Sequence, residues 1–202
     1  MNRETRNYKE KTESAFWHAV FQKEASYAEE YFTKKDALLS VGCGPAGVER
    51  ILLARGFDLT GLDVSGEALS CAPQEMRKFE GSAEEMPFPD RSFDGVIFIA
   101  SLQFMKDPAK ALKESARVLR EGGSLMLMLL NPLSPFFLER SQRSDSHVSK
   151  IRHSDPVPLV EAAAMLFETK IDYRLGIGGK TIFETSDPSA ASLVVVRGRK
   201  RD

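Results

Sequence analysis

Residues 41–49, VGCGPAGVE, join a strand-like stretch to a helix-like one. The stretch that leads into them, ALLSVG (37–42), is apolar and ends in glycine, which is typical of a buried strand. The stretch that continues from them, PAGVERILLARG (45–56), has apolar residues at helical spacing and a final glycine. Three glycines match the spacing G-x-G-x-x-G: Gly42, Gly44 and Gly47. Such glycines allow a tight turn and a close approach of the backbone to a ligand, so this unit predicts an α/β fold.

Strand-like and helix-like stretches alternate around this unit, from about residue 37 to residue 130. Further strands are expected at FDLTGLD (57–63), MRKFEG (76–81), FDGVIFIA (93–100) and SLMLMLL (124–130). A helix is expected before the strand at 124–130, with Asp107 as its N-cap and Pro108 as its first residue. Gly122 and Gly123 are expected to end this helix. The alternation predicts a doubly wound, mostly parallel sheet with helices on both faces.

The regions on either side of this core have a different character. Residues 14–33 are rich in Ala, Glu, Phe and Tyr and predict a helix. Residues 131–156 are long and polar, and we interpret them as either a mobile loop or an irregular cover over a substrate. A helix is expected at VPLVEAAAMLF (157–167), followed by two strands, TKIDYRLGI (169–177) and ASLVVVRG (191–198), close enough to form a hairpin.

Composition restricts the class of protein. The chain has 202 residues, a formal net charge of −1 and a pI near 6.4, which gives no general attraction to nucleic acid or to anionic membranes. The polar N-terminus shows no secretory signal, and the longest apolar run is far short of a membrane span. The two cysteines, Cys43 and Cys71, provide neither a disulfide framework nor a zinc motif. We therefore expect a cytoplasmic protein with no metal, nucleic-acid or membrane partner.

Asp63 ends the second predicted strand, about 20 residues beyond the first glycine. A carboxylate at this place accepts hydrogen bonds from both hydroxyls of an adenosine ribose, while the helix after the glycines presents free N–H groups. The pattern therefore predicts a cofactor that contains adenosine; the alternative is a tight turn with an unrelated surface aspartate. The glycine loop alone does not decide between a nicotinamide dinucleotide and S-adenosylmethionine.

The order of motifs over residues 37–131 resembles the class I S-adenosylmethionine-dependent methyltransferases. The likeness is strongest to their small-molecule branch, which includes the ubiquinone and menaquinone biosynthesis type. LLSVGCGPAG resembles the cofactor loop, LTGLDVS the ribose-binding strand end, and ALKESARVLREGGSLML the helix, turn and fifth strand. GSAEEMPFPDRSFDGVIF resembles the segment from the adenine contact into the fourth strand. This last motif is the most specific, because a nicotinamide-binding domain has no reason to carry it there.

The resemblance implies a Rossmann-like sheet of seven strands with an antiparallel final strand. It also implies one methyltransferase domain over residues 1–202 that acts as a monomer or homodimer on a small-molecule methyl acceptor. The expected parts are an N-terminal helical cover (1–36), a cofactor-binding core (37–131), a substrate-side segment (132–168) and a closing hairpin (169–202).

The resemblance also implies which residues contact the cofactor. Gly42, Cys43 and Gly44 are expected to contact its methionine part through the backbone. Asp63 is expected to hold the ribose hydroxyls, and Val64 to lie against the adenine.

Four further residues follow the third and fourth strands. Ser82 and Ala83 are expected to flank the adenine ring, and Ile99 and Ala100 to lie beneath the methionine part and the sulfonium.

The sequence departs from the family pattern in three ways. Many relatives have an acid in place of Ser40 that helps to orient the ammonium end of the cofactor, and often an aspartate in place of Ser82. Gln103 and Phe104 replace a usual pair of histidines. These departures keep open a second hypothesis, a non-catalytic or degenerate scaffold with the same fold. A third hypothesis, an NAD-dependent oxidoreductase, lacks a Tyr-x-x-x-Lys pair in this sequence.

The candidate general base is His153, since it lies in the polar segment where substrate contacts are expected. Its alternative is an ordinary surface histidine. Aromatic faces near the sulfonium would add cation–π stabilisation. The candidates are Tyr8, Phe16, Trp17 and Tyr31, for each of which simple packing is the alternative.

Overall fold

The computed structural model describes residues 14–144 and 146–201 and contains one eight-stranded sheet. The strand order is β3-β2-β1-β4-β5-β8-β6-β7. The strands are β1 (Ala37–Val41), β2 (Asp58–Asp63), β3 (Arg77–Glu80), β4 (Phe93–Ile99), β5 (Leu119–Leu130), β6 (Phe167–Gly178), β7 (Thr181–Phe183) and β8 (Ala191–Lys200). The predicted α/β class and mostly parallel sheet are confirmed.

The first five strands pair in parallel, and β8 then runs antiparallel between β5 and β6. The prediction of seven strands was wrong. The additional strand is β7, which pairs with the end of β6 after the turn at Gly179. Three residues at a sheet edge are held by their hydrogen bonds to β6, and they are too few to show an alternating pattern in the sequence.

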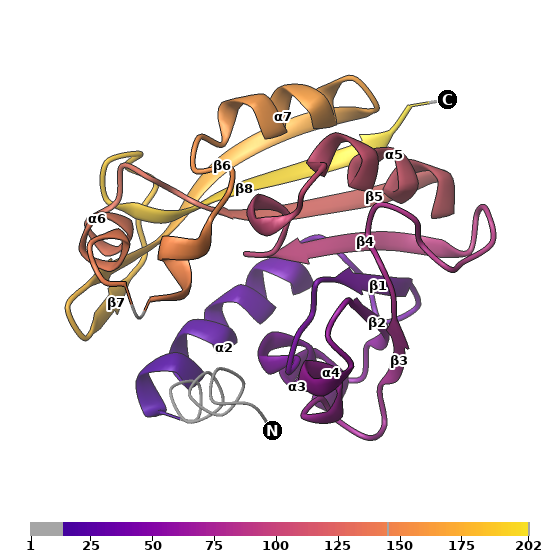
Figure 1. Cartoon of the computed structure of the whole chain (residues 1–202), viewed down its shortest axis with the longest axis horizontal. Coiled ribbons are helices and arrows are strands. Elements are labelled where there is room, and N and C mark those ends of the chain that lie inside the picture. Colours follow the sequence, from indigo (N-terminus) through magenta and orange to yellow (C-terminus); the bar gives the residue numbers. More distant parts are fainter. Residues whose placement is uncertain (1–13, 145, 202) are drawn as a thin grey trace.

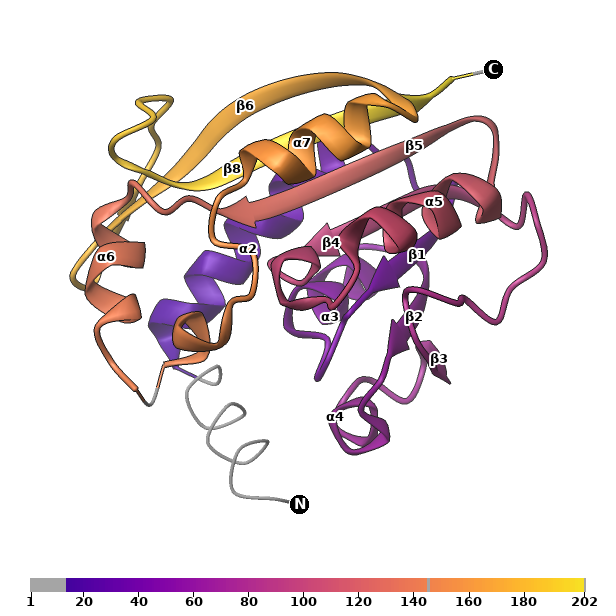
Figure 2. The ribbon, with the colours of Figure 1, turned by 45° about the horizontal axis from the view of Figure 1, so that its top comes forward.

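Helices cover the sheet in two layers (Figure 1 and Figure 2). On one face lie α2 (Ala15–Glu29) and α3 (Gly47–Ala54), and on the other lie α5 (Pro108–Val118) and α7 (Val157–Ala164). Successive side chains of β1 point to opposite faces of the sheet and so enter both hydrophobic cores. Leu38 packs on the α2–α3 face, while Leu39 and Val41 pack on the α5–α7 face. Short helix α4 (Gly66–Ser70) follows β2.

Helix α2 is fixed to α3 by both packing and charge. The guanidinium of Arg55 donates hydrogen bonds to Glu29 and Gln22. Gly47 begins α3 directly under the ring of Phe21, where a Cβ atom would lie 2.7 Å from Phe21 Cε2. The third glycine of the loop therefore allows close helix packing, and only the first two have a positive φ.

Capping signals set most helix starts. Ser14, Ser65 and Asp107 each accept a hydrogen bond at the N-terminus of the following helix. Gly122 and Gly123 do not end a helix as expected, since α5 stops at Val118 and β5 begins at once. The glycines lie within β5, next to the place where its register with β4 shifts.

The segment after Asn131 contains helix α6 (Pro135–Ser141) and a 3₁₀ turn, η2 (His147–Lys150). Ser134 caps α6 by accepting a hydrogen bond from the Phe137 N–H, and Pro135 is its first residue. This serine–proline start was a readable signal for a helix. Over the described residues, no helix is both long and apolar enough to cross a membrane.

Candidate cofactor-binding site

The predicted cofactor residues gather at the carboxyl edge of the parallel strands. Val41 pairs with Leu62, and Asp63 with Glu80, so β1, β2 and β3 end level with one another. Strand β4 ends beside β1. The residues at these four ends are Gly42, Cys43 and Gly44 after β1, Asp63 and Val64 at β2, Ser82 and Ala83 after β3, and Ile99 and Ala100 at β4. In open parallel sheets, ligands bind at this edge.

The glycine loop has a left-handed backbone at three of its positions. Gly42 has φ +71° and Gly44 has φ +51°, and Ala46 has φ 60° immediately before α3. A Cβ atom on Gly42 would lie 2.7 Å from Ser101 Cβ, so glycine is required there for space as well as for conformation. The Gly42 N–H donates to the Leu62 carbonyl at 2.7 Å, which joins the loop to β2. The loop is thus a half-buried turn that is hydrogen-bonded to β2.

Asp63 is held against this loop through both carboxylate oxygens. Oδ2 accepts from the Gly44 N–H at 2.8 Å, and Oδ1 accepts from the Ser65 N–H at 2.8 Å. Each oxygen keeps a further lone pair, so the carboxylate is positioned to accept from two neighbouring hydroxyl groups.

The neighbouring strand ends differ in exposure. Val64 is 71% exposed, which leaves its side chain open to a flat ligand, whereas Ala83 is buried. Ser82 Oγ accepts from the Glu84 N–H at 3.1 Å and so shapes the turn after β3. Ala100 has a left-handed φ of 46°, and the next residue, Ser101, donates to the Val41 carbonyl at 2.6 Å. This bond joins the end of β4 to the start of the glycine loop.

Cys43 is a structural residue of the loop. Burial, followed by the charges of Glu49 and Asp63, raises the pKa of its thiol well above its usual range. A thiol held protonated is a poor nucleophile. A Cβ atom on Gly61 would lie 2.7 Å from Cys43 Sγ, so the side chain is packed against β2.

Beneath the loop lies a buried polar group that the sequence interpretation missed. Ser40 Oγ donates to Glu49 Oε1 at 2.6 Å, and both residues are buried. Burial raises the pKa of Glu49, although the bond from Ser40 opposes this rise. Glu24 on α2 is also buried, and burial together with the charge of Glu49 raises its pKa to about 8. The signal was a glutamate on the apolar face of each predicted helix.

The side chain of Gln103 is buried and joins two backbone segments by hydrogen bonds. Its amide nitrogen donates to the carbonyls of Leu130 and His153 at 3.1 and 3.2 Å, and its oxygen accepts from the Leu130 N–H. Its side chain therefore holds residues after β5 and is not free for catalysis. Phe104 stacks on His147 with ring centroids 4.4 Å apart.

His153 lies close to the glycine loop through Met105. Its Nε2 is 3.1 Å from the Met105 carbonyl, and the Met105 side chain reaches within 3.7 Å of a Cβ built on Gly42. Because a carbonyl oxygen only accepts hydrogen bonds, this contact requires the hydrogen to be on Nε2. In that tautomer, Nδ1 is the nitrogen that accepts a proton.

The aromatic candidates separate into two places. Trp17 contacts Phe16, Phe21 and Phe136 in a cluster over the start of α3. Tyr31 instead donates its hydroxyl to the Gly198 carbonyl at 3.0 Å, and Gly198 pairs with Leu125 near the other end of the sheet. For Tyr31 this position favours the packing alternative over a contact with a sulfonium at the carboxyl edge. Tyr8 lies outside the described residues.

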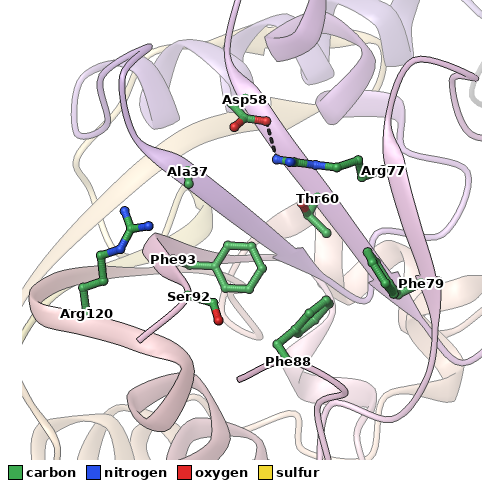
Figure 3. A pocket seen from close by; sticks show the side chains of 9 residues that line it. All are labelled: Ala37, Asp58, Thr60, Arg77, Phe79, Phe88, Ser92, Phe93 and Arg120. Carbon is green, nitrogen blue, oxygen red and sulfur yellow. Dashed lines mark hydrogen bonds and ion pairs between the residues drawn. The ribbon is translucent and has the colours of Figure 1, made fainter. Parts of the chain in front are cut away.

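A pocket of about 330 Å³ lies at the opposite edge, where the strands begin (Figure 3). Its charged lining residues are already paired, Arg77 with Asp58 at 2.6 Å and Arg120 with Asp94 at 2.6 Å. It is separate from the glycine loop and contributes nothing to the site.

Comparison with known proteins finds a family match over the core of the chain. Residues 39–127 match the family model described as a methyltransferase domain. The match covers the strands from β1 to β5 that carry all nine predicted cofactor residues.

Curated proteins that are similar to this region are named for different methyl acceptors. A demethylmenaquinone methyltransferase of Tropheryma whipplei is 27% identical over 133 residues, which are 61% of this chain and 56% of the relative. A 27-O-demethylrifamycin SV methyltransferase of Amycolatopsis mediterranei is 38% identical over 128 residues, 57% of this chain and 46% of the relative. The chain spans about half the length of the curated relatives it matches.

Solved structures show the same fold over nearly the whole chain. An S-adenosylmethionine-dependent methyltransferase of Thermotoga maritima, described as a possible histamine N-methyltransferase, superposes with a TM-score of 0.81. The superposition covers 96% of this chain and 95% of that one at 21% identity. The two chains therefore share the fold, including the helices outside the domain match.

Proposed function

We propose that this protein transfers a methyl group from S-adenosylmethionine to a small-molecule acceptor. The observation that carries the proposal is the position of Asp63, whose carboxylate is fixed by the Gly44 N–H against a left-handed glycine loop at the carboxyl edge of the sheet. The match of this region to a methyltransferase domain favours S-adenosylmethionine over NAD.

The residues at this edge fit the parts of that cofactor. Gly42, Cys43 and Gly44 offer backbone to its methionine part, Asp63 accepts from its ribose hydroxyls, and Val64 presents an exposed apolar face to the adenine. When bound, S-adenosylmethionine supplies an already activated methyl group on a sulfonium.

Four residues at the neighbouring strand ends complete the proposed site. Ser82 and Ala83 would border the adenine, and Ile99 and Ala100 would border the sulfonium.

The chain itself has to align the acceptor and receive its proton. Alignment of a nucleophile with an activated group supplies a large part of the rate of such a reaction. His153 is the proposed base, because Met105 fixes its Nε2–H and leaves Nδ1 free to accept a proton. Gln103 holds the backbone of His153 and so positions it.

We propose a small-molecule acceptor because the named relatives act on a demethylmenaquinone and a demethylrifamycin, and because the balanced charge offers nothing to nucleic acid. We further propose that residues 132–168 cover the acceptor and that residues 37–131 hold the cofactor within a single domain. The serines at positions 40 and 82 are the features that favour the degenerate scaffold, and measurement of cofactor binding distinguishes it from this proposal.

The test is isothermal titration with S-adenosylmethionine, S-adenosylhomocysteine and NAD. Binding of the two sulfur nucleosides at micromolar concentration, its loss in Asp63→Ala and no binding of NAD are expected. Absence of binding by either sulfur nucleoside would contradict the proposal. Binding of NAD alone would favour the oxidoreductase instead.

A further inference from the structure

Strand β6 lies beyond β8 at one side of the sheet and has a long free edge (Figure 2). On its inner side β8 pairs with residues 167–174, while on its outer side β7 pairs only with residues 176–178. Within the described residues, 14–144 and 146–201, no strand pairs with the outer side of residues 167–174. We call this outer side the β6 edge. Unpaired strand edges invite pairing with another chain unless they are short or covered.

The segment after β7 does not cover the β6 edge. A pocket of about 470 Å³ lies between residues 172–174 of β6 and residues 184–186, so the chain diverges from β6 here. Glu184 is held by α2 instead, where its carboxylate accepts from the Tyr27 hydroxyl at 3.1 Å. Among the described residues, no turn or loop hydrogen bond involves the backbone of residues 167–174. The β6 edge is therefore open to an incoming strand.

The hydrogen-bond pattern shows which residues face this edge. The Arg201 N–H donates to the Leu166 carbonyl at 3.2 Å, one position before the ladder between β6 and β8 begins. Hydrogen-bonded pairs alternate with non-bonded pairs along an antiparallel ladder. The even-numbered residues of β6 therefore bond to β8, while Thr169, Ile171 and Tyr173 direct their N–H and C=O groups towards the free edge.

The charges along the β6 edge are self-complementary. Residues 168–174 read ETKIDYR, and the four charged side chains share one face of the sheet because they alternate with uncharged ones. In a second copy turned antiparallel about Ile171, Glu168 lies opposite Arg174 and Lys170 lies opposite Asp172. Moving the centre by one residue places either Lys170 or Asp172 opposite its own copy. The register centred on Ile171 is the one in which all four residues face an opposite charge.

The contacts within one chain leave these groups available. Glu168 and Lys170 are exposed, and the ion pairs of the described residues include neither of them. Asp172 and Arg174 each have one ion pair within the chain, at 2.6 and 3.0 Å, and both side chains can form further hydrogen bonds. On the other face Ile171 is 48% exposed and would meet its own copy.

We propose that a second copy of this chain pairs with the β6 edge, antiparallel and centred on Ile171, so that the two sheets become continuous. The outward groups of Thr169, Ile171 and Tyr173 form about six backbone hydrogen bonds in this register. The charged pairs occupy the non-bonded positions, where side chains are closest. The interface is smaller than the roughly 1,600 Å² of a standard one, so a reversible dimer at micromolar concentration is expected.

This assignment is independent of the proposed function. The cofactor residues lie at the ends of β1 to β4, and β5 and β8 separate these strands from β6. Because the pairing is antiparallel, the carboxyl edges of the two copies point in opposite directions, and neither copy covers the site of the other.

Sedimentation velocity of the full chain tests the dimer at protein concentrations from roughly 1 to 200 μM. Lys170→Glu puts like charges opposite each other twice in each dimer and should raise the dissociation constant by about 10-fold or more. Lys113→Glu is the matched control, since it makes the same change at an exposed residue of α5 and should stay within about twofold. Raising salt from about 0.1 to 0.5 M should weaken the wild-type dimer and strengthen that of Lys170→Glu.

A cysteine on the symmetry axis tests the register. In Ile171→Cys the two Cα atoms would lie about 5.5 Å apart, within the range of a disulfide. In Thr169→Cys the same atoms would lie roughly 13 Å apart, because Thr169 faces Tyr173 of the second copy. With oxidised glutathione as the oxidant, Ile171→Cys should give a disulfide-linked dimer on a non-reducing gel. Thr169→Cys and the wild type, with its two native cysteines, should not.

A mixture of two charge variants gives a test by rescue. Lys170→Glu and Asp172→Lys should each dimerise poorly alone and should form a mixed dimer together, because each then meets an opposite charge. Thermal unfolding verifies that each variant is folded. If Asp172→Lys does not fold, the cysteine variants still decide the register.

Three outcomes would overturn the assignment. A wild-type protein that is monomeric at every concentration would show that the charges guard the β6 edge against pairing. A dimer as stable in Lys170→Glu as in the wild type would place the contact on another surface. Equal cross-linking of Thr169→Cys and Ile171→Cys would reject the register.

Discussion

The two faces of the sheet are built from different chemistry. On the α5–α7 face, Leu39, Val41 and Phe98 pack against apolar helix residues, and the hydroxyl of buried Ser115 bonds to the Ala111 carbonyl of its own helix. On the α2–α3 face, the same strand β1 places Ser40 next to Glu49, and Glu24 is buried on α2 with no ion pair among the described residues. One face is thus packed with apolar side chains, while the other contains two buried carboxyl groups whose pKa values burial raises.

The largest effect should come from Asp63→Ala at the edge shared by both faces. Loss of the carboxylate that we propose to accept from the two ribose hydroxyls should weaken S-adenosylmethionine about 100-fold or more. Isothermal titration measures this loss. Unchanged affinity in a folded Asp63→Ala protein would show that the ribose is not held here.

Leu112→Ala tests the packed face. Leu112 is fully buried on α5, so truncation should lower the free energy of unfolding by about 2–5 kcal/mol. Urea denaturation measures the change. Affinity for S-adenosylhomocysteine should remain within about twofold in the folded protein, and a large loss of affinity would break the distinction between the two faces.

Glu24→Gln tests whether the charged face costs stability. The folded-state pKa of Glu24 is raised from 4.5 to about 8, so the folded state binds more protons than the unfolded state between these values. The contribution of this carboxyl group to stability should therefore be greatest below pH 4.5 and fall as pH rises towards 8, by up to about 1.4 kcal/mol per pH unit.

The comparison of pH profiles isolates this effect. Urea denaturation at several pH values should give a flatter profile for Glu24→Gln than for the wild type, with the relative gain of the variant largest near pH 8. Parallel profiles would contradict a raised pKa at this site.

The smallest effect is expected from Ala46→Gly in the loop itself. Ala46 has φ 60°, a conformation that costs an alanine roughly 1 kcal/mol, and glycine removes this cost while adding freedom to the unfolded chain. A net gain of stability of about 0.5 kcal/mol is expected by thermal unfolding. A loss of stability would show that the methyl group of Ala46, which is fully buried, contributes more through packing.

Local signals in the sequence were sufficient for much of the fold. The strands of the parallel core, the glycine turn and the capping residues Ser14, Ser65 and Asp107 all follow from short-range chemistry. The end of α5 was predicted wrongly, because the pairing of β5 with β4 outcompetes the tendency of Gly122 and Gly123 to mark a turn. Strand β7 was missed because three residues carry no periodic pattern, and α6 because its length and polar context concealed its serine–proline start.

For the site, the sequence by itself determined that a glycine loop and Asp63 terminate neighbouring strands. Parallel strands end at a common edge, so proximity follows from the order of the elements. Only the tertiary structure decided that Asp63 is bonded to Gly44 and that Gln103 clamps His153. It also buried Glu24 on α2 and Glu49 on α3. These residues are 25 positions apart on separate helices, and their burial follows from the packing of α2 on α3, which no local pattern in the sequence encodes.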